Sequence, residues 1–123
     1  MLVDSNILIY AFLGGNRSLQ RFVVQRLPAV SAITYVEVLG YHRLSGRQKA
    51  VIEQLFDDLS VLPLDRPVLA QAVKLRQQRH IGLGDALIAA TALVHHRTLV
   101  TRNTADFAWI PDLQLLDPCA EAE

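Results

Sequence analysis

Four acidic side chains lie where metal-assisted chemistry on a phosphate is possible. Asp85 heads an apolar run over residues 86–94, Asp4 follows the apolar residues 1–3, and Glu37 and Asp106 lie on two further segments. Mg²⁺ is commonly held by one or two carboxylates plus substrate oxygens, and it can activate a water and stabilise a leaving oxygen. Clustered carboxylates also repel one another, so such a site favours a bound cation or a retained proton.

Three of these acids, Asp4, Glu37 and Asp85, also have a purely structural explanation when each is taken alone. An aspartate in the first turn of a helix, such as Asp85, caps N–H groups and interacts well with the helix dipole. Asp4 can be an ordinary turn aspartate. Glu37 lies three residues after Thr34, the spacing of a capping box. The sequence leaves both explanations open for each residue.

The segments that position these acids alternate between strand and helix. The predicted strands cover residues 1–3, 29–32, 61–64, 98–101 and 113–116. Between them, helical patterns cover residues 6–13, 18–27, 34–44, 47–59, 67–79 and 85–94. This alternation predicts an α/β fold, a three-layer α/β/α domain with a mainly parallel central sheet of four to five strands. Pro63 places its strand at an edge.

The carboxyl ends of parallel strands meet at one edge of a sheet, where ligands bind. Asp4, Asn103 and Asp106 all come just after a predicted strand. We therefore expect them to face a common crevice, with Asp85 joining them. Asn6 and Thr101 are expected to orient the carboxylates or a water by hydrogen bonds.

Length and composition predict a single domain. With 123 residues, of which 51% are hydrophobic, the chain can form one core. We expect the domain over residues 1–118 and a frayed acidic tail over residues 119–123. The single cysteine, Cys119, excludes an intramolecular disulfide and fits a reducing, cytoplasmic setting. The apolar runs are too short to cross a bilayer, so no membrane association is expected.

The charge balance does not decide whether nucleic acid is a partner. Basic and acidic residues number 12 each. If four acids are held by metal, the remaining 8 leave an excess of 4 positive charges. The net charge of zero therefore does not exclude RNA or DNA.

Four sequence blocks carry a resemblance to a known family. They are LVDSNILI at residues 2–9, SAITYVEV at 31–38, DALIAATA at 85–92, and LVTRN at 99–103 followed by DF at 106–107. In this order, the blocks resemble the PIN-domain ribonucleases, and most closely the VapC-type toxins of bacterial and archaeal toxin-antitoxin pairs. The resemblance extends from one end of the chain to the other.

The resemblance implies an endoribonuclease that depends on Mg²⁺ or Mn²⁺, with one or two ions, and cleaves RNA phosphodiester bonds. Asp4 and Asp85 match the principal metal-binding acids, Glu37 matches the third, and Asp106 matches an acid often found before the phenylalanine. Many relatives have aspartate where this chain has Asn103, which bears on whether a second ion is held.

The resemblance also implies partners besides RNA. A cognate antitoxin silences such toxins, a homodimer is usual, and larger toxin-antitoxin assemblies form. The residues expected to contact an antitoxin lie on helices that relatives use for docking: Leu8, Phe12, Leu19, Phe22 and Tyr41. Ordinary core packing is the alternative for each of them.

Two other classes of function remain open. A phosphatase or phosphotransferase can use a strand-end aspartate such as Asp4 as its nucleophile, although it usually has a second acid where this chain has Asn6. A non-catalytic PIN-like interaction module is the other class, and such modules commonly lose acids like those retained here.

Overall fold

Five short parallel strands form the centre of the molecule. The computed structural model describes residues 1–121. One sheet has the order β1 (Leu2–Val3), β4 (Leu99–Val100), β5 (Leu115–Leu116), and a second pairs β2 (Val30–Ser31) with β3 (Val61–Leu62). A parallel bridge between Leu2 and Ala29 joins the two sheets. The predicted parallel sheet is therefore confirmed, and β3, which contains the residues before Pro63, lies at an edge.

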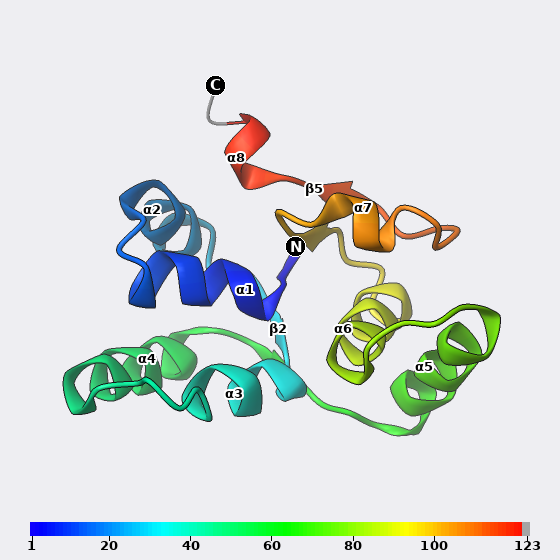
Figure 1. The fold of residues 1–123 in the computed structure, drawn as a ribbon, viewed down its shortest axis with the longest axis horizontal. Helices are drawn as coiled ribbons and strands as arrows, with labels where there is room; N and C mark the ends of the chain where they lie inside the picture. Colours follow the sequence, from blue (N-terminus) through cyan, green and yellow to red (C-terminus); the bar gives the residue numbers. More distant parts are fainter. Residues whose placement is uncertain (122–123) are drawn as a thin grey trace.

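Helices fill the connections between the strands and cover the sheet (Figure 1). In chain order they are α1 (Ser5–Leu8), the π-helix η1 (Ile9–Leu13), α2 (Arg17–Arg26), α3 (Ala32–Leu39), α4 (Gly46–Asp58), α5 (Arg66–Gln78), α6 (Leu83–Val94), α7 (Thr104–Phe107) and α8 (Pro118–Glu121). None of them, within the described residues, has the length and apolarity needed to span a membrane.

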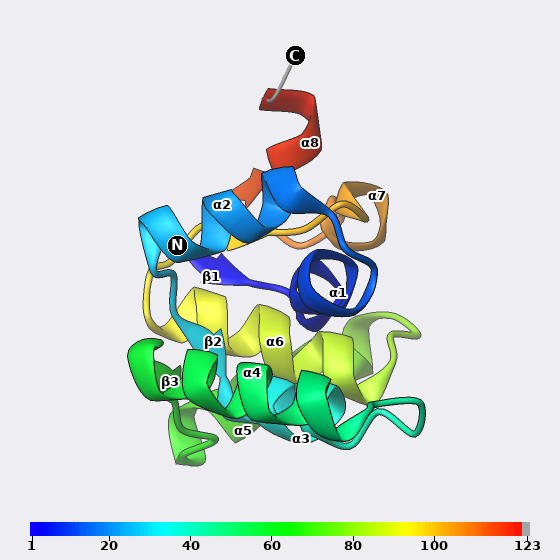
Figure 2. The same ribbon diagram turned by 90° about the vertical axis from the view of Figure 1, so that its left-hand side faces the viewer.

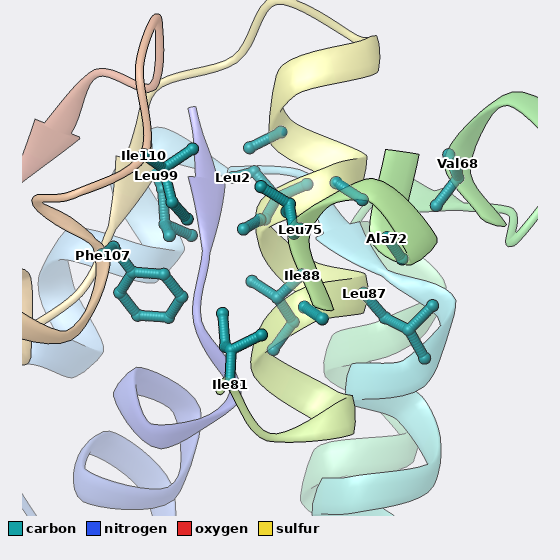
Figure 3. Close-up of a cluster of buried hydrophobic side chains, with 14 residues drawn as sticks. Leu2, Val68, Ala72, Leu75, Ile81, Leu87, Ile88, Leu99, Phe107 and Ile110 are labelled. Atoms are coloured by element: carbon teal, nitrogen blue, oxygen red, sulfur yellow. The ribbon is translucent and has the colours of Figure 1, made fainter. Parts of the chain in front are cut away.

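Successive residues of the inner strands point into two different cores. Leu2 and Leu99 are fully buried in a cluster with α5 and α6, which Figure 3 shows together with Phe107 and Ile110. Val3 and Val100 are buried in a second cluster with α1, α2 and α4. This alternation is the two-residue period of a strand. The sheet is thus covered on both faces, and β1 runs between α2 and α6 (Figure 2), as the three-layer prediction requires.

Helix α6 is the most buried helix of the fold. Every residue from Ala86 to Ala92 is buried, because the run is apolar and rich in small side chains that allow close approach to the sheet and to α5. Its N-terminus therefore holds a fixed position relative to the ends of the strands.

Several predicted boundaries are wrong. The helix expected over residues 34–44 begins at Ala32, because the Ser31 hydroxyl accepts from the Ile33 amide at 3.3 Å, and it ends at Leu39. The segment predicted as helix over residues 6–13 is α1 followed by the π-helix η1. Thr104–Phe107, for which no helix was predicted, form α7.

The C-terminal segment differs from the predicted frayed tail. Pro118–Glu121 form α8, where the Asp117 carboxylate accepts from the Cys119 amide at 2.9 Å and Pro118 stands at the first helical position, which needs no N–H donor. Cys119 packs against the second core. Residues 122–123, also part of that prediction, lie outside the described residues.

Candidate active site

Asp4 is a buried carboxylate at the carboxyl end of β1. Its side chain is only 3% exposed, and its backbone amide donates to Val100 O at 2.9 Å, which ties it to β4. The Thr101 hydroxyl donates to Asp4 Oδ2 at 3.0 Å and accepts from the Asn103 amide at 3.0 Å. Thr101, which was expected to support the carboxylates, therefore contacts Asp4 directly. Asn103, also expected to do so, acts indirectly because its amide holds the Thr101 hydroxyl.

Burial raises the pKa of Asp4. Hydrogen bonding to Thr101 and to the backbone of Asn6 offsets part of this rise in pKa, and the charge of Glu37 adds to it. Asn6 therefore acts through its main chain. Its side chain is exposed, so the expected orienting role for the amide side chain has no counterpart in these contacts.

Glu37 is held by the hydroxyl of Ser5, the residue that follows Asp4. Ser5 Oγ donates to Glu37 Oε1 at 2.7 Å and lies 2.9 Å from Thr34 Oγ1. Because a serine hydroxyl carries one proton, it donates to the carboxylate and accepts from Thr34. The capping box considered for Thr34 and Glu37 is wrong, since α3 begins two residues before Thr34 with Ser31 as its cap.

Gly84 makes room for Glu37. A Cβ atom built on Gly84 would lie 2.5 Å from Glu37 Oε2 and 3.2 Å from its Cδ. The carboxylate of Glu37 therefore rests against the first turn of α6, next to Asp85. A side chain at position 84 would occupy the space that this carboxylate uses.

Asp85 is the third residue of α6 and is partly buried. Burial, followed by the charges of Asp4, Asp106 and Glu37, raises its pKa to about 6. The first-turn position still suits the helix dipole. Capping does not explain the residue, because the cap position is Gly82 and no side-chain cap bond forms there.

The four acids predicted from the sequence therefore act on one another. We call Asp4, Glu37, Asp85 and Asp106 the acid cluster. Asp106 lies on α7 with an exposed side chain. The four come from the end of β1 and from α3, α6 and α7. Segments distant in sequence therefore converge near the edge of the sheet where the strands end.

The donor chemistry of the acid cluster fits a hard divalent cation. The side chains of the cluster offer only carboxylate oxygens, which hard divalent ions prefer. Burial and neighbouring carboxylates raise the pKa values of Asp4 and Asp85. A bound cation would offset both effects, because it stabilises the charged form of each carboxylate. Within the described residues, no three Asp, Glu, His or Cys side chains are gathered closely enough to share an ion. The acids are therefore close enough to change one another's pKa, but they do not form a complete set of ligands around one point.

Sequence reasoning missed Ser5, Thr34 and Gly84 as parts of this site. Ser5 follows Asp4 directly, and Gly84 precedes Asp85, so adjacency to a candidate acid was the one available signal. The contacts themselves join residues that are far apart in the chain and appear only in the fold.

The residues expected to contact an antitoxin divide into two groups. Leu8 and Leu19 are buried in the second core, so for these two the expectation of an exposed contact is wrong. Phe12, Phe22 and Tyr41 are partly exposed. Phe22 lines a hollow of about 590 Å³ between α2 and α8, and another of about 580 Å³ lies beside α5 and α6. No member of the acid cluster lines either hollow.

Comparisons with known proteins agree along nearly the whole chain. The model of the PIN domain family matches residues 1–112. Ribonuclease VapC1 of Haemophilus influenzae strain R2866 is 33% identical over an alignment that covers 94% of this chain and 96% of that protein.

Solved structures agree as well. A toxin-antitoxin complex from Klebsiella pneumoniae contains a chain that is 32% identical, with a TM-score of 0.79 and coverage of 95% and 96%. VapBC-1 from nontypeable Haemophilus influenzae is 30% identical, with a TM-score of 0.77 and coverage of 96% and 97%. The strands and helices described above therefore recur in these proteins.

Proposed function

The chain belongs to the PIN domain family, with VapC ribonucleases among its relatives, and on that premise we propose that it is a ribonuclease toxin dependent on Mg²⁺ or Mn²⁺. The proposal includes endonucleolytic hydrolysis of RNA phosphodiester bonds in the cytoplasm. The observation that carries it is the acid cluster, in which a buried carboxylate and three others act on one another from separate segments. The names of the relatives support RNA as the substrate.

In this proposal Asp4 and Asp85 would hold the ion, and the charges of Glu37 and Asp106 would add to the negative field that attracts it. A divalent ion, when bound, supplies an activated water and stabilises charge on the phosphate and the leaving oxygen. Thr101 fixes the carboxylate of Asp4, and Ser5 fixes that of Glu37. Asn103 stands where many relatives have aspartate. Because its side chain is neutral, the site has one negative charge fewer, which favours one firmly held ion over two.

Replacement of Asp4 or Asp85 by asparagine tests the metal site. The amide keeps the side-chain shape but removes the charge that binds the cation, so we expect cleavage to fall at least a hundredfold, about 3 kcal/mol in transition-state stabilisation. The measurement is cleavage of total RNA with mapped 5′ ends, in Mg²⁺ and in EDTA.

Asp57→Asn is the matched control, because Asp57 is an exposed acid on α4 outside the acid cluster. Its activity should equal that of the parent chain. Equal cleavage by the parent chain in EDTA and in Mg²⁺ would falsify the metal dependence, and activity retained in both cluster variants would exclude the acid cluster as the active site.

We also propose that a small antitoxin protein binds this chain and that the chain forms a homodimer. The similar solved structures are toxin-antitoxin complexes, which supports the first part. The docking surface would include Phe12, Phe22 and Tyr41, which are partly exposed. Growth arrest on expression alone, relieved by co-expression of the partner, is the expected behaviour.

A further inference from the structure

An arginine in the segment between Thr101 and Asp106 is stacked on a tyrosine. The guanidinium carbon of Arg102 lies 4.7 Å from the centre of the Tyr10 ring, and both side chains are exposed. Arg102 directly follows Thr101, the residue that donates to Asp4. Tyr10 lies on η1, the helix that continues from α1 and thus from Asp4 and Ser5.

The guanidinium is not neutralised by a carboxylate. Within residues 1–121 the one ion pair is Lys49–Glu53, at 4.0 Å. Arg102 therefore has no acidic partner within that distance, although the next residues carry the chain to Asp106. Stacking on Tyr10 restrains the guanidinium, and it leaves the in-plane N–H donors available for bidentate contact with an anion.

The surface continues into a small hollow beside the same tyrosine. Tyr10, Tyr41 and Arg43 line this hollow, which has a volume of about 300 Å³. Aromatic rings interleaved with basic groups are the surface that single-stranded nucleic acid uses, because bases stack on rings and phosphates meet the cations.

We propose that Arg102, supported by Tyr10, binds a phosphate of single-stranded RNA beside the acid cluster. The proposal rests on the proposed function and adds the groups that hold the substrate. Four carboxylates repel a polyanion, so an approaching strand needs a cation beside them. Arg102 is a positioning residue here: it holds the strand, and the acid cluster carries out the reaction.

The test is Arg102→Gln, compared with Arg26→Gln. Arg26 also stacks on an aromatic ring, that of Phe22, at 5.4 Å. Arg26 lies in the last turn of α2, a few residues before the start of β2. The start of β2 is at the opposite end of the parallel strands from the acid cluster. Both variants lose one charge and one stacked guanidinium, so any difference between them comes from location.

Two readouts are measured: the Kd of a mixed-sequence single-stranded RNA oligonucleotide in EDTA, and KM and kcat for its cleavage in Mg²⁺. For Arg102→Gln we expect Kd and KM to rise about three- to tenfold with kcat nearly unchanged. The slope of log K against log salt should shrink by about 0.7, the contribution of one phosphate contact on a single strand. Arg26→Gln should match the parent chain.

A second pair of variants separates charge from support. Tyr10→Phe keeps the ring and should leave Kd unchanged, whereas Tyr10→Leu removes the stack and should raise Kd in the same direction as Arg102→Gln. Equal Kd and KM for Arg102→Gln and the parent chain would overturn the proposal, and so would equal effects of Arg102→Gln and Arg26→Gln.

Failure of the proposed function gives a different result. If the parent chain binds the oligonucleotide through Arg102 but does not cleave it, the proposed binding site is supported and the proposed nuclease activity is refuted. If the parent chain neither binds nor cleaves RNA, both are overturned.

Discussion

At the scale of single residues, the placement of Glu37 depends on a missing side chain. The space that a Cβ on Gly84 would fill is occupied by the Glu37 carboxylate. The backbone of Gly84 is ordinary α-helix with no positive φ, so its role is to leave room and not to make a turn.

Replacement of Gly84 by alanine should separate activity from stability. The atom that the new Cβ would meet is the far end of the flexible Glu37 side chain, so Glu37 can rotate away and the fold is kept. Alanine in place of glycine in a helix raises the free energy of unfolding by about 0.5 to 1 kcal/mol. We expect RNA cleavage to fall about ten- to a hundredfold because a carboxylate is misplaced. The measurements are cleavage rate and urea denaturation.

Gly82→Ala is the control for this substitution. A Cβ on Gly82 meets nothing within 4 Å, so Glu37 stays in place and activity should be kept. A fully active Gly84→Ala protein would show that the position of Glu37 does not matter for cleavage.

At the scale of secondary-structure elements, α6 holds Asp85 in place because the face of the helix toward the sheet is buried. Ile88 is 1% exposed within the first core, and Leu83 on the same helix is 60% exposed. Ile88→Ala should lower the free energy of unfolding by about 2 to 5 kcal/mol through lost burial and a cavity. Leu83→Ala should change it by less than about 0.5 kcal/mol.

Urea denaturation followed by circular dichroism measures both variants of α6. Similar losses in the two would mean that α6 is not anchored through its inner face. The expected difference follows from which face of one helix meets the sheet.

The alternation of elements was predictable because strands and helices have different hydrophobic periods. Three members of the acid cluster were predictable from this alternation, since Asp4 and Asp106 follow strands and Asp85 heads an apolar helix. Glu37 was assigned to the site only through the family resemblance. The partners of Glu37 were not, because Ser5 and Gly84 meet it only through the fold. Local capping logic also misplaced the start of α3, where Ser31 competes with Thr34 for the cap. The buried positions of Leu8 and Leu19 likewise depend on which helix faces pack together.

At the scale of the whole molecule, the acid cluster sets how stability depends on pH. The pKa of Asp85 is raised from 3.8 to about 6, so the folded state binds its proton more tightly than the unfolded state does. Metal-free protein should therefore lose stability as pH rises from about 4 to 6. The full shift corresponds to at most about 3 kcal/mol. Because the carboxyl is partly exposed, we expect about 1 kcal/mol.

The measurement is urea denaturation in EDTA between pH 4 and 8, repeated with Mg²⁺. Asp4 shifts in the same direction and adds to the effect. Mg²⁺ should restore stability at pH 7.5 in the parent chain by binding the folded state alone. Asp85→Asn should flatten the pH dependence and remove much of the response to Mg²⁺. Rising stability between pH 4 and 6 in EDTA would contradict the assignment.

The hydrogen bond from Thr101 to Asp4 spans 97 positions of the chain. During synthesis Asp4 therefore leaves the ribosome about a hundred residues ahead of Thr101 and Asp106. A chain that stops before residue 99 lacks Thr101 and Asp106, so its acid cluster is incomplete and Asp4 has lost a hydrogen-bond donor. If the proposed function holds, no partly synthesised chain of this kind can cut RNA.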